Sequence, residues 1–261
     1  MTGVPHHSKD YIERRTESTL RSFVPAALTE VQPTPLGDIA ARVSEQLGAT
    51  FHFDQELGLT SQGQKILGAC YFEPAFAIFV DPSLQSADGS ARFRFTLAHE
   101  LGHLSLHRNL RLDFQSLDAT ARAIVDGERD LQPGPRELIT PRDFLEWQAN
   151  SYAAALLMPR VTFRSALALQ QLDMGITRRP GMVYLSDGTG SANDFREIVH
   201  RLSTVYQTST TATRIRIQEL GLLHDGRQSS TPFEGQVTMP QALSQALQDL
   251  LAKRDSPSET E

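Results

Sequence analysis

The stretch RFRFTLAHELGHLSLH, residues 92–107, joins an apolar run to three histidines and a glutamate that all lie within its last nine residues. Its pattern, uninterrupted by proline, predicts a helix. His99 and His103 are four positions apart, about 40° around a helix, so both imidazoles can bind one metal ion. Glu100 can then reach a water held on that ion without being a ligand, as a general base does. The motif therefore predicts a metal site.

A catalytic zinc ion usually takes three protein ligands and leaves one position for water. The extended pattern HExxHxxGxxH does not supply the third ligand here, because Leu106 stands in place of glycine and Asn109 in place of histidine. The best candidate is Glu146, which begins the apolar helix EWQANSYAAALLMP. Asn150 follows it on the same face and is a candidate to orient a ligand.

Several other acids remain alternatives for the third ligand, because a folded loop can bring any of them back to the metal. We expect them instead to be solvated surface charges. They are Asp126, Glu128, Asp130, Glu137 and Asp143. His107 lies on the same helix face as His103 but too far along the axis to share an ion with His99. We expect it to support or cap the site.

Outward from the motif, helical spacing and proline positions predict helices over residues 10–24, 36–47 and 141–158. The segments FHFDQ and KILGACYFEPAFAIFVD are rich in aromatic and β-branched residues and predict short strands, with a hairpin divided at Glu73 and Pro74. Residues 108–143 are polar, contain proline and predict a lid or flexible loop. The fold class expected is thus α+β, mostly helical with a small antiparallel sheet.

The C-terminal third predicts a hairpin at MVYLSDG, two helices joined at QTST, and a final amphipathic helix PQALSQALQDLLAK followed by a disordered tail. The helix pair has the layout of a DNA-reading module. From residue 195 to 225, however, its charges sum to only +1: Arg196, Arg201, Arg214 and Arg216 against Glu197, Glu219 and Asp225. A protein-docking or structural role is therefore favoured over operator binding.

Composition limits the class of protein. The chain has 261 residues, 39% of them hydrophobic, a formal net charge of −6 and one cysteine. We expect no membrane span and no signal peptide, and a single cysteine favours the reducing cytoplasm. The acidic balance gives no overall case for nucleic-acid binding.

RFTLAHELGHLSLH followed by EWQANSYAAALLMP resembles the ImmA/IrrE family of zinc-dependent metallopeptidases, over roughly residues 36–160. Tyr152 stands where the family usually has phenylalanine, and the insertion between the motifs is longer than usual. The resemblance implies a zincin-like fold, Zn²⁺ on His99, His103 and Glu146, and Glu100 as general base. It also implies a substrate: a cognate helix-turn-helix repressor, cut at one site to relieve repression in a stress, DNA-damage, phage or mobile-element response.

The resulting organisation has an N-terminal helix or arm over residues 1–30 and a metallopeptidase domain over 31–177. A helical, helix-turn-helix-like segment follows over 178–253, with the tail at 254–261. Single-stranded DNA as an activator would fit a damage response, but no residue demonstrates it. The alternative function is a non-catalytic DNA- or protein-binding regulator that keeps zinc only for folding. Intact Glu100 argues against it, because a structural ion needs no base beside its ligands.

Three further features are left open by the sequence. Cys70, the only thiol, is expected to be a small buried apolar residue, and the sharper hypothesis makes it an inhibitory ligand at zinc's open position. The strand from Cys70 to Phe79 is a candidate edge for pairing with an extended substrate. The oxyanion-stabilising residue is not determined; the candidates are Tyr152, Tyr184, His200 and Tyr206.

Overall fold

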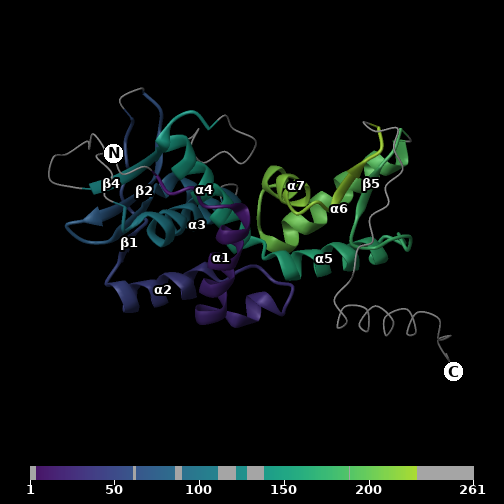
Figure 1. Ribbon diagram of the computed structural model, residues 1–261, viewed down its shortest axis with the longest axis horizontal. Coiled ribbons are helices and arrows are strands. Elements are labelled where there is room, and N and C mark those ends of the chain that lie inside the picture. Colours follow the sequence, from purple (N-terminus) through teal and green to yellow (C-terminus); the bar gives the residue numbers. More distant parts are fainter. Residues whose placement is uncertain are drawn as a thin grey trace.

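The computed structural model describes residues 4–60, 63–85, 90–110, 122–127, 138–187 and 189–227. Over these residues the chain is α+β, with a four-stranded sheet and helices α1–α4 on one side of the molecule and α5–α7 on the other (Figure 1). The helices are α1 (Lys9–Phe23), α2 (Leu36–Leu47), α3 (Ser90–His107), α4 (Pro141–Leu157), α5 (Arg160–Asp173), α6 (Thr189–Tyr206) and α7 (Thr210–Glu219). Short 3₁₀ turns occupy Pro25–Leu28 and Pro82–Gln85.

The helices expected from the sequence form close to their predicted bounds. Helix α4 shows why: the Thr140 hydroxyl accepts from the Asp143 backbone N–H, and the Asp143 carboxylate accepts from the Thr140 N–H. This capping box, with Pro141 in the first turn, fixes where the helix begins. Helices α3 and α4 pack closely at Gly102, where an added Cβ would lie 3.1 Å from the backbone oxygen of Ala149.

The main sheet has the order β1-β3-β2-β4, with β1 (Thr50–His52), β2 (Ile66–Glu73), β3 (Ala77–Val80) and β4 (Arg122–Gly127). The predicted hairpin is confirmed, since β2 and β3 pair antiparallel. The expectation of an antiparallel sheet is wrong in one respect. Strand β1 pairs parallel with β3, because β2 intervenes in the chain and β3 returns in the direction of β1. The sheet is therefore mixed.

Strand β4 corrects the prediction that residues 108–143 form only a lid or loop. It pairs antiparallel with β2, with Gly68 opposite Asp126 and Cys70 opposite Ile124. The short β-branched run at Ile124 and Val125, ended by Gly127, favours a strand that buries one face. Residues 111–121 and 128–137 of that segment lie outside the described part.

The C-terminal part contains a second, two-stranded sheet. The expected hairpin at MVYLSDG is wrong. Strand β5 (Val183–Leu185) pairs parallel with β6 (Leu223–Asp225), a strand that follows α6 and α7 in the sequence. The two predicted helices joined at QTST are confirmed as α6 and α7. The final amphipathic helix and the tail lie outside the described residues. In the part of the chain that is described, no helix has the length and apolar character to cross a membrane.

Candidate metal centre

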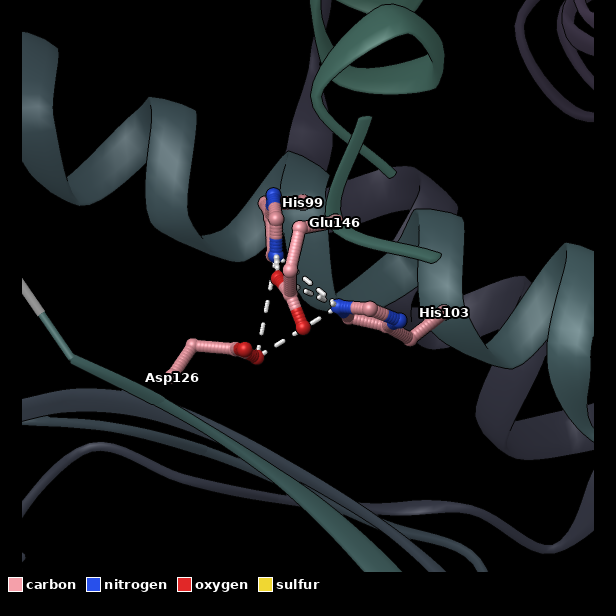
Figure 2. A group of neighbouring side chains, drawn as sticks. All are labelled: His99, His103, Asp126 and Glu146. Atoms are coloured by element: carbon pink, nitrogen blue, oxygen red, sulfur yellow. Dashed lines mark hydrogen bonds and ion pairs between the residues drawn. The ribbon is translucent and has the colours of Figure 1, made fainter. Parts of the chain in front are cut away.

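Four buried side chains from three elements converge on one point between α3, α4 and the edge of the sheet (Figure 2). His99 and His103 come from α3, Glu146 from the first turns of α4 and Asp126 from β4. One donor atom of each lies within 4.8 Å of every other, and none of the four is more than 1% exposed. Two imidazoles and two carboxylates thus converge on a single position.

Four distances in this group, each from an imidazole nitrogen to a carboxylate oxygen, match those around a small metal ion, and the distance between the two imidazole nitrogens is shorter. The Nε2 atom of His99 lies 3.3 Å from Glu146 Oε2 and 3.6 Å from Asp126 Oδ2, and the corresponding distances from His103 Nε2 are 3.5 and 3.4 Å. The two Nε2 atoms are 2.9 Å apart. Bonds of 2.0–2.2 Å to a tetrahedral ion separate its donors by about 3.3–3.6 Å. The donor set therefore fits a metal ion such as zinc.

Several carboxylate oxygens in and beside the group lack a hydrogen bond of good geometry within the described part of the chain. Asp126 Oδ2, both oxygens of Glu146 and both oxygens of Glu100 are buried without a hydrogen bond of good geometry from the described residues. Buried oxygens normally have such partners. A cation among the carboxylates would satisfy the oxygens of Asp126 and Glu146, and this independent observation supports the same site.

The outer nitrogens of both histidines are held by neighbours. His99 Nδ1 lies 2.9 Å from Asn150 Oδ1, so the amide oxygen orients the ring by accepting its N–H. His103 Nδ1 lies 2.9 Å from His107 Nδ1, and His107 Nε2 lies 3.2 Å from Gln148 Oε1. The Gln148 amide donates to the carbonyl oxygen of Pro5, 2.8 Å away. Such contacts fix the tautomer and leave both Nε2 atoms aimed at the shared point.

Glu100 is fully buried beside this group, on the side of the sheet. The backbone of β2 comes so close that a Cβ built on Gly68 would lie 2.0 Å from Glu100 Oε1. Glycine at this position thus makes the space in which the carboxylate lies. Burial, followed by the charge of Asp126 and then of Glu146, raises the pKa of Glu100 well above its ordinary value.

The metal-free protein balances the buried acids with protons on the imidazoles. Burial lowers the pKa of His103, but Asp126 and Glu146 more than offset this and raise it to about 9. Burial would likewise raise the pKa of Asp126, yet the two histidines hold it well below its ordinary value. His107 differs: burial and then His103 lower its pKa well below normal, so it stays neutral. Positive charge in the metal-free site therefore sits where a cation would bind.

No protein-family model, curated protein or solved structure matches this chain. The assignment of the centre therefore rests on its own residues and geometry.

The structure brings together the expected residues His99, Glu100, His103 and Glu146, with Asn150 and His107 in contact with the imidazoles. It corrects the expectation for Asp126, which is fully buried in the group and is not a surface charge. Asp143 caps α4 at a partly buried position and is not in the group of possible ligands. Glu128, Asp130 and Glu137 lie outside the described residues.

The structure does not place Cys70 among the possible metal ligands, as the hypothesis of an inhibitory ligand required. It is fully buried on β2 among the hydrophobic core residues, and the described group of possible ligands does not include it. The structure thus places it as a small apolar core residue, and the fourth donor of the group is Asp126.

Arg142 is a residue that the sequence reasoning missed. Its guanidinium donates to the carbonyl oxygen of Val125, 2.6 Å away, and lies 3.5 Å from Asp126 Oδ1 and 3.6 Å from Glu146 Oε1. It lies four positions before Glu146 on α4, and that helical spacing was the available indication. Arg142 is half-exposed beside the buried acids. Of the oxyanion candidates from the sequence, Tyr152 bonds Thr19 and Tyr206 packs at a tilt against Phe163.

Two of the four arginines counted in the C-terminal segment are paired with acids in the structure. Arg216 is buried and pairs with Glu13 of α1, while Arg201 pairs with Glu197 and Asp173. Neither is available to contact phosphates. The ion pair between Arg216 of α7 and Glu13 of α1 joins the C-terminal part of the chain to the N-terminal part. This contact supports a structural role for α7.

We expect the metal-free protein to lose stability as the pH rises from about 6.5 to about 9. The pKa of His103 is raised from 6.5 to about 9 by folding, so its stabilising contribution is full below 6.5 and is lost as pH rises through 9. The raised pKa of Glu100 acts in the same direction. Thermal unfolding in chelator at several pH values measures the change. A flat profile, or one of undiminished size in His103→Gln, would contradict the assignment.

Replacing Gly68 by alanine should destabilise the protein by about 1–3 kcal/mol, as overpacking does in other cores. The new methyl group would meet Glu100 and also Thr96 Cγ2, 3.0 Å away. Denaturant unfolding measures the loss, and Gly37→Ala, where nothing lies within 4 Å, is the control. In a Glu100→Ala background the cost should shrink, because the main clash is gone. An unchanged cost there would contradict the packing argument.

Proposed function

We propose that this protein is a zinc-dependent endopeptidase of zincin-like fold that cleaves a cognate helix-turn-helix transcriptional repressor. The observation that carries the proposal is Glu100. Its carboxylate is buried against the metal group with no hydrogen bond of good geometry from the described residues. Burying a carboxyl group without such a bond is costly, and a site that needed zinc only for folding would have no use for it.

His99, His103 and Glu146 would hold the ion, which when bound supplies a Lewis acid and lowers the pKa of a water molecule towards about 7. Glu100 takes a proton from the attacking water and passes it to the nitrogen of the leaving amine. The proton thus moves from the water oxygen to the amine nitrogen, and the Glu100 carboxylate is regenerated. Asn150 and His107 keep the imidazoles oriented, and the Arg142 guanidinium donates towards the carbonyl oxygen as it gains charge.

The class of substrate rests on the resemblance of the two motifs to the ImmA/IrrE family. A repressor cut at one site, in response to stress, DNA damage, a phage or a mobile element, is the substrate that this resemblance implies. The acidic chain and the paired arginines of α6 and α7 support a protein substrate over an operator.

A second candidate function is favoured by one observation. Four protein donors converge here, and a closed set of four is typical of structural zinc. On that view the protein is a regulator that binds protein or DNA and keeps zinc for folding.

The test uses the full chain, loaded with zinc, and helix-turn-helix repressors encoded beside its gene. We expect one of them to be cut at a single bond, with loss of cleavage in chelator and recovery after zinc is restored. Mass spectrometry of the products identifies the bond. If the zinc-loaded protein, and a variant lacking the Asp126 carboxylate, cut none of them, the structural-zinc function is favoured.

A further inference from the structure

The edge of β2 beside the metal group is already occupied, by β4. Strand β4 is the last strand of the sheet, and its antiparallel ladder runs along β2 from Ile66 to Glu73. An extended peptide that adds to a sheet edge pairs in this manner. The ladder places Asp126 opposite Gly68, the residue against which the Glu100 carboxylate packs. Strand β4 therefore carries Asp126 to the general base.

Asp126 takes the position that a catalytic site needs open. Its Oδ2 atom lies as close to the two imidazole nitrogens as Glu146 Oε2 does, at 3.4–3.6 Å against 3.3–3.5 Å. Four such donors complete a tetrahedron and leave no room for water. The Asp126 carboxylate thus belongs to the donor group, on the strand that pairs with Gly68, against which Glu100 packs.

Asp126 is also the donor whose removal disturbs the fold least. Glu146 sits on a capped helix whose packing against α3 is tight at Gly102. Asp126 sits on an edge strand that pairs with β2 alone in this sheet, with register shifts between Ile66 and Gly68 and between Tyr71 and Glu73. Edge strands are the part of a sheet that another chain can replace.

We propose that β4 is an internal, substrate-like strand: it closes the resting site with Asp126 as fourth ligand, and an extended segment of the substrate replaces it on β2. This inference rests on the proposed function. In the exchange the Asp126 carboxylate leaves the donor set and one water molecule enters, with no covalent bond made or broken. The cleaved segment is then an extended linker of the repressor, not part of its folded helices.

The strand also indicates what the substrate presents. Ile124 precedes Asp126 by two positions, so it lies on the same face, and it is buried in the core at 3% exposure. A displacing segment needs an apolar side chain at that register to refill the space. Peptides with a charged residue there should be poor substrates.

The first measurement tests Asp126 without relying on catalysis. The Co²⁺-loaded full chain is compared with Asp126→Ala and with Glu45→Gln, an exposed acid on α2 as control. We expect the visible spectrum of Asp126→Ala to shift as water replaces the carboxylate, with a loss of metal affinity of about 10-fold, while the control matches the wild type. An unchanged spectrum and affinity in Asp126→Ala would overturn the proposal, whether or not the protein is a peptidase.

The second measurement tests displacement of the strand. Cys70 is the only cysteine and lies opposite Ile124, so Ile124→Cys allows one disulfide that staples β4 to β2. We expect the oxidised variant to lose at least about tenfold in repressor cleavage and to recover on reduction, as for a locked lid. The Cys70→Ser, Ile124→Cys variant should respond to neither treatment.

Cleavage by the stapled protein at the rate of its reduced form would overturn the substrate-like role of β4. Absence of cleavage in both redox states and in Asp126→Ala, with the spectral shift present, would instead reject the proposed function and leave Asp126 as a ligand of a structural site. The two failures are therefore distinguishable.

Discussion

Glu100→Gln is expected to lower repressor cleavage by about 10²–10⁴-fold while zinc stays bound. Glutamine has nearly the shape of glutamate, so it fits between Gly68 and Thr96, but it cannot take the proton of the attacking water. Product formation over time measures the loss, and metal content per chain shows that the site remains loaded. The size of the effect separates a general base from a residue that merely fills space.

The same variant has a second expected effect. Because burial and two nearby acids raise the pKa of Glu100, removing its ionisable group should make the metal-free protein more stable at neutral pH. The unfolding midpoint in chelator tests this, with Glu45→Gln as the matched exposed control. Near-normal cleavage by Glu100→Gln would reject the mechanism. A gain in stability in a protein that cuts no repressor in either form would favour the structural-zinc alternative.

The site could be predicted from the sequence where its geometry is local. The spacing of His99, Glu100 and His103 on one helix is set by the helical repeat, and it needs no tertiary information. Glu146 lies on a different element, and a buried helix that begins with an acid, together with the resemblance of the two motifs, was enough to nominate it. Asn150 follows from Glu146 by the four-residue spacing of a helix, whereas Arg142, at the same spacing on the other side, was not nominated.

Asp126 could not be chosen from the sequence over the other acids as a possible ligand, because its position depends on the pairing of β4 with β2. The run Ile124, Val125 and Gly127 indicated a short strand, but polar, proline-bearing neighbours concealed it within a long insertion. Which strand it would join, and in what register, is a non-local property. The parallel pairing of β5 with β6 was missed for the same reason, since its two strands are separated by a pair of helices.

Glu146→Ala is expected to weaken zinc binding by about 100-fold or more. Four-ligand zinc sites contribute about 10–16 kcal/mol, so one ligand accounts for about 3 kcal/mol. Its removal also leaves the imidazoles of His99 and His103 with Asp126 as the only carboxylate of the group. Competition with a chelating dye measures the affinity, and the zinc-induced rise in the unfolding midpoint should shrink accordingly.

The comparison with Asn150→Ala makes this result specific to ligation. Asn150 bonds the outer nitrogen of His99 and is not in the group of possible ligands, so its loss should cost about 10–100-fold in metal affinity. Helix α4 carries both residues, and a general disturbance of that helix would affect the two variants alike. A rigid three-ligand site closed by a removable fourth donor requires a graded order of metal affinity. Glu146→Ala should bind the metal most weakly, Asn150→Ala more tightly, and Asp126→Ala should lose the least affinity. Equal losses in Glu146→Ala and Asp126→Ala would instead make the two acids equivalent, as in a site that never opens.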